Sequence, residues 1–540
     1  MYRKKDYICT KYDAMETINT EMSGYPIGQQ DFKQLRENQF IYVDKTSFIN
    51  KLIEGKYQYC FLARPRRFGK SLFLSTLKYF FQGEKELFKG LFIDSTDWKW
   101  EEYPVLHLDL NNDRYAEKGR LDDLLDNRFR RWEKEYGVEG IANNYSQRFQ
   151  NIIKAAHEKT GRGVVILVDE YDKPLVGNLN KPEIFEFYRA QLASIYSNFK
   201  SSAEHIRLVF LTGVSRFSKL SVFSDLNNIN DITFDNDFAD ICGITESEMT
   251  KYFHDGINNI ANEYEMRYEE ACRLLKRNYD GYRFAKKGSD IYNPWSLLNA
   301  FSKKFMDYYW VMTGMPTIIA EALRRIDADL EKVMNTRCSM RALSGMDLLS
   351  PNPIALMYQT GYLTIKNYDR SSDMVSLGVP NREVEQGLFE VLLPYYVKVK
   401  RGLVESVVSD LIIDILDGNP QGLMKNLDIF LAGIPYDMKI ENENNFHNAL
   451  YILLTLIGIK TDTEVRTSDG RIDLVVKTDK FIYIIELKFN DNAETAIEQI
   501  KEKNYAYPYS HDSRRIFIIG ANFSSKTRHL DKPLIFEIEK

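Results

Sequence analysis

A glycine-lysine-serine triplet at residues 69–71 constrains the fold of this chain more than any other feature. It follows a short apolar run, Tyr59–Ala63, which predicts a strand, and precedes an amphipathic stretch over residues 72–81, which predicts a helix. In the order strand, loop, helix, backbone N–H groups of the loop and of the helix start hold phosphate groups. We therefore expect a phosphate-binding loop at one edge of an α/β sheet.

The loop before this helix supplies the candidate nucleotide-binding residues. Lys70 would reach the β- and γ-phosphates of ATP, and the Ser71 hydroxyl would bind Mg²⁺. Arg64 stands where the common pattern of such loops has its first glycine. The alternative interpretation is a basic strand-to-helix turn that binds no ligand. The loop candidates are Arg64, Arg66, Arg67, Phe68, Gly69, Lys70 and Ser71.

A second apolar run, residues 164–168, ends in Asp169 and Glu170. A buried strand here would deliver Asp169 to the carboxyl edge of the sheet, where it can bind Mg²⁺. Glu170 would then polarise the water that attacks the γ-phosphate. Alone, two such acids often mark only a strand end, but together with the loop they indicate an ATP site.

A third run, residues 206–211, ends in polar residues followed by Arg216. The polar groups at this sheet edge can sense the γ-phosphate, and Arg216 is a candidate arginine finger. A single arginine after a strand is also commonly a surface residue, so both interpretations of Arg216 stay open.

The C-terminal region carries a second group of candidate residues. Asp473 lies in one strand-like run, and Glu486 and Lys488 lie in the next, where residues two apart share a face. Both carboxylates and the carbonyl of Leu487 would form an oxygen-rich Mg²⁺ site, to which Glu443 is a further candidate ligand. The metal would activate water for phosphodiester cleavage, while Lys488 positions it or stabilises charge.

The alternative for this group is a surface hairpin in which Glu486 and Lys488 form a solvated pair. A glutamate and a lysine inside an otherwise apolar strand are costly unless they are paired or bind a metal. The residue pattern therefore favours a nuclease-like metal site.

Composition limits the class of protein. The 540 residues carry 72 Lys and Arg against 77 Asp and Glu, so a nucleic-acid site must be a local patch. The five cysteines are scattered without zinc-site spacing, which favours reduced thiols and a cytoplasmic location. Apolar runs are too short to span a bilayer, so we expect no membrane segment.

The pattern along the chain predicts four segments. An N-terminal extension covers residues 1–24, and alternating strands and helices over 25–243 indicate a mainly parallel α/β sheet. Residues 244–434 show mostly helical spacing, and residues 435–540 indicate a compact second α/β module. Aromatic residues in the middle segment can stack on unpaired bases, although packing in a core is the more common role.

Several short segments resemble one family of bacterial and archaeal proteins, which joins an AAA-ATPase-like domain to a C-terminal PD-(D/E)XK nuclease superfamily domain. The resemblance implies a P-loop NTPase sheet that binds ATP and Mg²⁺, a helical, winged-helix middle region and a restriction-endonuclease-like C-terminal fold. The segments that carry it are residues 25–28 with 31–32, 42–46, 64–71, 168–172, 212–215, 279–284, 292–296, 358–364, 472–473 and 486–488.

Three functions follow as hypotheses. The first is an ATP-regulated, Mg²⁺-dependent nuclease that acts on nucleic acid, with DNA as the expected substrate. The second is a nucleotide-dependent switch or scaffold whose nuclease-like module only binds nucleic acid or a partner. The third is a nuclease whose nucleotide loop has become structural. A homo-oligomer is a further expectation, with a ring and a dimer both open.

Overall fold

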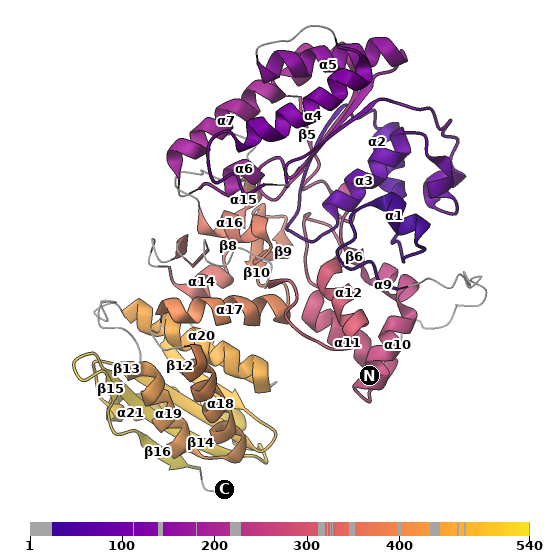
Figure 1. Ribbon diagram of the computed structural model, residues 1–540. Helices are drawn as coiled ribbons and strands as arrows, with labels where there is room; N and C mark the ends of the chain where they lie inside the picture. The colour runs from indigo at the N-terminus through magenta and orange to yellow at the C-terminus, as the bar shows by residue number, and fades with distance from the viewer. Residues whose placement is uncertain are drawn as a thin grey trace.

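The computed structural model describes residues 24–538 except 112, 139–143, 180, 217–227, 312–318, 321, 324–325, 327, 345–351, 397–400, 433–442, 462–463 and 469–470. For residues 401–405, 443–447, 459–461, 464–468 and 471–474 it describes the backbone alone. Three parts follow one another across the molecule: an N-terminal α/β part, a mostly helical middle and a C-terminal α/β part (Figure 1). This arrangement confirms the predicted fold class.

The first part is built on a sheet of five parallel strands in the order β2-β3-β4-β1-β5. The apolar runs form these strands because both faces of the sheet are covered by helices, and every residue of β1 and β3 is buried. Strand β4 lies between β1 and β3, so the loops after all three strands meet at one edge. The strands are β1 (Tyr59–Ala63), β2 (Val105–Asp109), β3 (Val164–Asp169), β4 (Ile206–Gly213) and β5 (Asn230–Asp231).

The helices of the first part lie on both sides of this sheet (Figure 1). They are α1 (Phe32–Glu37), α2 (Thr46–Glu54), α3 (Lys70–Phe81), α4 (Arg120–Tyr136), α5 (Tyr145–Thr160), α6 (Lys173–Val176), α7 (Pro182–Tyr196) and α8 (Asn198–Ser201). Helix α3 directly follows the loop after β1, as the sequence predicts.

The middle region begins with a helical group packed around its own core. The Thr245 side chain and Glu248 form a capping box at the first helix of this group, and Asn293 followed by Pro294 starts the last one. The elements are β6 (Ile244–Thr245), α9 (Glu246–Tyr252), α10 (His254–Glu263), α11 (Tyr268–Tyr279), β7 (Ile291–Tyr292) and α12 (Pro294–Lys303).

The next elements follow the winged-helix order of helix, strand, two helices and two strands, with the sheet order β8-β10-β9. The third helix of this unit, α16, has seven of its eight residues buried, so it faces the protein interior. The elements are α14 (Leu330–Met334), β8 (Arg337–Ser339), α15 (Met340–Ser344), α16 (Pro353–Thr360), β9 (Thr364–Asp369) and β10 (Met374–Gly378). Three helices complete the region: α17 (Arg382–Tyr396), α18 (Arg401–Asp417) and α19 (Pro420–Ala432).

The C-terminal part has a mixed sheet in the order β11-β12-β13-β14-β15, with β16 also paired to β14. Strands β13 and β14 are parallel and the other pairs are antiparallel. The helix after β13 ends at Glu502. The elements are α20 (Glu443–Thr461), β11 (Glu464–Ser468), β12 (Arg471–Lys477), β13 (Phe481–Phe489), α21 (Ala493–Glu502), β14 (Arg515–Ser524), β15 (His529–Leu530) and β16 (Leu534–Glu537).

One apolar core extends from the first sheet through the middle region to the C-terminal sheet. It includes Phe61 of β1, Tyr362 of the middle region and Tyr483 of β13. No helix within the described ranges is both long enough and apolar enough to cross a bilayer.

Candidate functional site

The loop after β1 has the backbone geometry of an anion cradle. Gly69 has φ +94° and directly precedes helix α3, a conformation that glycine adopts without steric cost. Arg67 also has a positive φ, 67°, which is uncommon for a residue with a side chain. No side chain in the described part of the loop caps α3, so its first N–H groups are available for phosphate oxygens.

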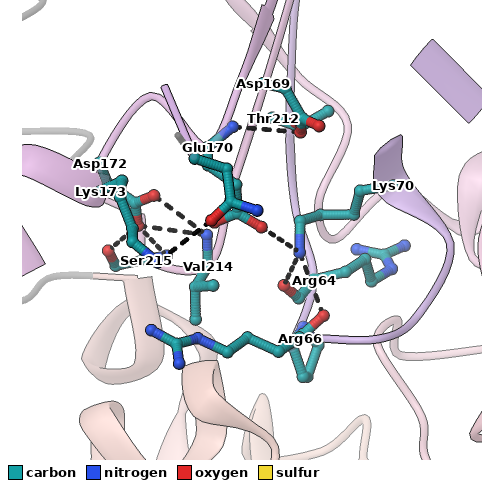
Figure 2. A network of polar contacts seen from close by, with 12 residues as sticks. Arg64, Arg66, Lys70, Asp169, Glu170, Asp172, Lys173, Thr212, Val214 and Ser215 are labelled. Atoms are coloured by element: carbon teal, nitrogen blue, oxygen red, sulfur yellow. Dashed lines mark hydrogen bonds and ion pairs between the residues drawn. The ribbon is translucent and has the colours of Figure 1, made fainter. Parts of the chain in front are cut away.

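The Lys70 side chain lies over this loop and is almost fully buried (Figure 2). Its ammonium group donates hydrogen bonds to the carbonyl oxygens of Arg64, at 3.1 Å, and Pro65, at 3.2 Å. It also lies 3.3 Å from a carboxylate oxygen of Glu170. The predicted phosphate-binding lysine and the predicted catalytic glutamate are therefore adjacent.

Asp169 ends β3 beside the loop, as predicted, and is 4% exposed. Its carboxylate accepts a hydrogen bond of 2.5 Å from the Thr212 hydroxyl of the neighbouring strand. Burial and the charge of Glu170 raise the pKa of Asp169, while hydrogen bonds with Ser71 and Thr212 lower it. A buried carboxylate beside a serine hydroxyl at a helix start is a donor set that suits Mg²⁺.

Glu170 and Asp172 follow in a turn that packs tightly on the end of β4. Glu170 has φ 51°, a second non-glycine residue in the left-handed region at this edge of the sheet. Asp172 accepts hydrogen bonds from the backbone N–H groups of Val214 and Ser215 and from the Ser215 hydroxyl (Figure 2). Gly213 permits this approach, because a Cβ there would lie 2.6 Å from the Tyr171 ring.

A cavity of about 360 Å³ opens beside these groups. Polar side chains of Arg66, Lys70, Ser71 and Glu170 line it. A smaller, mostly apolar cavity of about 90 Å³ adjoins it and shares the walls formed by Pro26, Gly69, Leu72, Pro294 and Leu298. The two cavities together form a polar compartment next to a mostly apolar one.

Five consecutive residues of the loop each contact the middle region. The Arg64 guanidinium lies 4.5 Å from the Phe284 ring centre, and Arg67 lies 4.2 Å from that of Trp295. Pro65 packs against Gly361, where an added Cβ would come within 2.9 Å. The Arg66 carbonyl accepts a hydrogen bond of 2.9 Å from the Trp310 indole, and the Phe68 ring packs edge-on against Tyr282 and Phe284.

These contacts place the aromatic segments of the middle region in the core, the more common of the two roles considered from the sequence. Tyr279, Tyr282 and Tyr292 are at most 1% exposed, and Phe284 is 6% exposed. Buried rings of this kind are not available to stack on bases. Two of them, Tyr282 and Phe284, pack against Phe68 of the nucleotide loop.

The Arg64 side chain corrects its assignment as a phosphate-binding group. It is 1% exposed and donates hydrogen bonds to the carbonyls of Ala63, Thr233 and Phe238, at 2.8 to 3.1 Å. Because these carbonyls bind the guanidinium, only the backbone of Arg64 is left to contact a phosphate in the loop. The arginine replaces the usual glycine because it ties the loop to the chain after β5.

Arg216 is likewise engaged away from the loop. Its guanidinium pairs with Asp231, donates to the Ser344 hydroxyl at 2.6 Å and lies over the Phe234 ring. Its backbone N–H donates to Gln359 of α16. The structure therefore does not bring Arg216 to the other predicted nucleotide-binding residues, and its side chain links the first part to the winged-helix unit.

Two residues that the sequence did not single out connect the loop to helix α17. The backbone N–H of Trp310 donates a hydrogen bond of 2.6 Å to Glu383, which also accepts one of 2.9 Å from the Ser296 hydroxyl. Glu383 is 1% exposed, and burial raises its pKa to about 8. The only sequence signal was a glutamate at a position that becomes the first turn of a mostly apolar helix.

In the C-terminal part, the structure brings Glu486 and Lys488 together on β13. The Lys488 ammonium donates to Glu486 at 2.8 Å and to Gln499 of α21 at 2.5 Å. Glu486 is 1% exposed, and its second carboxylate oxygen has no hydrogen-bond partner among the described residues. A buried carboxylate oxygen without a partner fits a metal ligand. The carbonyl of Leu487 belongs to the same strand.

Asp473 lies on β12 directly opposite Glu486 in the antiparallel register, as the sequence predicts. Its side chain, and that of Glu443 at the start of α20, lie outside the described side chains. Among the side chains that are described, no cluster of three or more His, Cys, Asp or Glu residues could hold a metal ion. Of the predicted metal-binding side chains at this site, the structure therefore describes that of Glu486, and for Asp473 it describes the backbone.

Comparisons with known proteins match the two regions that contain these residues. A family model described as a predicted AAA-ATPase matches residues 26–223, and a model described as the PD-(D/E)XK nuclease superfamily matches residues 441–532. The chain is 35% identical over 522 residues to a protein of Azotobacter chroococcum mcd 1 named "Uncharacterized protein in vnfD 5'region". That alignment covers 93% of this chain and 97% of the relative.

Proposed function

Because the chain belongs to the family that joins a predicted AAA-ATPase-like domain to a C-terminal PD-(D/E)XK nuclease superfamily domain, we propose that it is an ATP-regulated, Mg²⁺-dependent nuclease. ATP binding and hydrolysis occur in the N-terminal domain, and phosphodiester cleavage of nucleic acid, with DNA as the expected substrate, occurs in the C-terminal one. The observation that carries the proposal is the group Lys70, Ser71 and Glu170 around one polar cavity, with Asp169 hydrogen-bonded to Ser71. The same chain holds the buried Glu486–Lys488 pair.

In the N-terminal domain, the N–H groups at the start of α3 and the ammonium of Lys70 bind the phosphates. Ser71 and Asp169 would hold Mg²⁺, which neutralises phosphate charge when bound. Glu170 orients and polarises the attacking water. Its ion pair with Lys70, 3.3 Å long, keeps the carboxylate beside the phosphate-binding group. The adjoining apolar cavity suits the base.

In the C-terminal domain, Glu486, Asp473 and the carbonyl of Leu487 would hold Mg²⁺, with Glu443 as a further candidate. The metal supplies activation of water and of the phosphodiester when it is bound. Lys488 stabilises the negative charge of the transition state, and Gln499 holds the lysine in place through its 2.5 Å hydrogen bond.

The two domains are coupled through helix α17. Trp310 contacts the nucleotide loop at the Arg66 carbonyl and Glu383 near the start of α17. Helix α17 packs along α20, the first helix of the C-terminal domain, where the Phe389 and Tyr451 rings meet edge to face at 5.5 Å. A change in the loop on ATP binding can therefore shift α17 and reposition α20.

Cleavage assays on plasmid and single-stranded DNA with Mg²⁺, with and without ATP, test this function. We expect Glu486→Gln and Asp473→Ala to lose cleavage and keep ATP hydrolysis, while Lys70→Ala loses hydrolysis and the ATP dependence of cleavage. The matched controls are Glu498→Gln, an exposed glutamate on α21, and Lys78→Ala on α3, both of which should behave as wild type.

Intact ATP hydrolysis with no cleavage under any condition would reject the nuclease function. The protein would then be a nucleotide-dependent switch whose C-terminal domain binds nucleic acid or a partner. Cleavage unaffected by Lys70→Ala would instead reject the coupling and leave a nuclease with a structural loop.

A further inference from the structure

A second polar cavity, of about 990 Å³, lies far along the chain from the nucleotide loop. Its walls come from helix α11, the winged-helix sheet β8-β10-β9, the start of α17 and the face of α20 that carries Tyr451. Its volume is at the upper end of the range for ligand sites, roughly 300 to 1,000 Å³. The cavity therefore sits where the middle region meets the C-terminal domain.

The ionisable lining of this cleft is mainly cationic. Four cations, Arg277, Arg337, Lys366 and Arg382, face it together with two carboxylates, those of Glu331 and Glu385. Four positive against two negative groups leave a formal charge of +2 in a chain whose total is -5.

The cations are contributed by four different elements, which fixes their arrangement in space. Lys366 on β9 is held by a hydrogen bond of 2.9 Å from its ammonium to the Pro380 carbonyl, and its stem packs against Gly378. Arg337 on β8 is directly opposite Ser376 in the register. Its guanidinium is 3.8 Å from Asp369, a long ion pair that leaves the side chain 62% exposed.

The orientation of the winged-helix unit also turns one face of its sheet toward the cleft. Helix α16 occupies the place of the helix that commonly enters a DNA groove, but it is buried against the nucleotide-binding part. The sheet face with Arg337, Lys366 and Ser376 opens into the cleft instead. Cationic and hydroxyl groups on a sheet face are suited to phosphate oxygens.

We propose that this cleft is a binding site for a phosphate-bearing ligand, supplied either by the backbone of a nucleic-acid strand or by a free nucleotide. Occupation would join the winged-helix sheet to α20, and so would favour one arrangement of the middle region and the C-terminal domain. The proposal does not depend on cleavage, because binding can be measured in EDTA.

The test is fluorescence anisotropy with the full chain in EDTA, in a Lys70→Ala background that removes binding at the nucleotide loop. One probe is a short labelled single-stranded DNA and the other is a labelled mononucleotide. The cleft variant is Arg337→Ser with Lys366→Ser. The control, Arg341→Ser with Arg370→Ser, removes the same charge from exposed positions of the same unit outside the cleft.

We expect the cleft variant to raise the Kd at least about tenfold and to reduce the slope of log K against log salt by about 1 to 2, as two lost phosphate contacts require. The control should bind as the background does, and Lys366→Arg should retain binding. A loss seen with the DNA alone identifies a strand, and a loss seen with the mononucleotide identifies a free nucleotide. Equal binding by cleft and control variants for both probes would overturn the proposal.

Discussion

Replacing Glu383 by glutamine should remove a specific pH dependence of stability. The carboxyl is buried, accepts hydrogen bonds from Trp310 and Ser296 through one oxygen, and has no partner for its other oxygen among the described residues. Because burial raises its pKa from 4.5 to about 8, it is protonated near neutral pH in the folded chain. Glutamine has nearly the same shape as this neutral form and keeps the accepting oxygen.

The magnitude follows from the two pKa values. A carboxyl whose pKa is raised on folding stabilises the fold fully below the unfolded pKa, and that stabilisation is lost as the pH rises through the folded pKa. The wild-type free energy of unfolding should fall by about 2 to 3 kcal/mol between about pH 6 and about pH 9 from this group alone. Subtracting the Glu383→Gln curve cancels the other titrating groups, so the difference isolates Glu383.

Urea unfolding followed by tryptophan fluorescence is the appropriate assay. All five tryptophans precede residue 311, so their signal reports the N-terminal and middle parts rather than the C-terminal domain. We expect wild type and Glu383→Gln to have similar midpoints at low pH, and the wild type to become less stable than the variant as the pH rises. Parallel curves for the two proteins across this range would refute the assignment of a neutral, buried Glu383.

Three further predictions concern the nucleotide loop. Arg64→Gly restores the usual glycine yet should destabilise the fold by roughly 3 to 5 kcal/mol, because it strips partners from buried carbonyls; an unchanged urea midpoint would contradict this. Gly361→Ala, at φ +91° and against Pro65, should cost about 2 to 3 kcal/mol in the same assay, with no loss if the loop can move aside. ATP and Mg²⁺ at about 100 times the Kd should stabilise the wild type by about 2.7 kcal/mol in thermal unfolding and leave Lys70→Ala unchanged; a shift that persists in the variant would place ATP elsewhere.

The sequence predicted those parts of the fold in which local pattern and burial agree. The apolar runs before Lys70 and Asp169 became central parallel strands, and the two-residue period of strands correctly placed Glu486 and Lys488 on one face of β13. The order of strand, loop and helix along the chain is sufficient to place the residues that follow these strands at one edge of the sheet. The strands β11, β15 and β16 were not predicted, because they are only two to five residues long and give too little pattern to mark a strand.

The roles of individual side chains depended on contacts that no local pattern contains. Arg64 looked like a phosphate ligand because it stands in the loop, but its partners at Thr233 and Phe238 come from after β5. Arg216 turned to Asp231 and Ser344 in the same way. Glu383 lies far from the loop in sequence, and only the fold joins it to the loop through Trp310.

The middle region contacts five consecutive loop residues, 64–68. These contacts limit where such a chain can be cut into separate folding units. An N-terminal fragment ending near residue 243 would expose the loop face that Phe284, Trp295 and Trp310 cover, and it should be poorly soluble. We therefore expect recombination between genes to transfer the ATPase-like domain and the middle region together. A different effector domain could replace the C-terminal one only if it offers an equivalent of α20 for helix α17 to pack against.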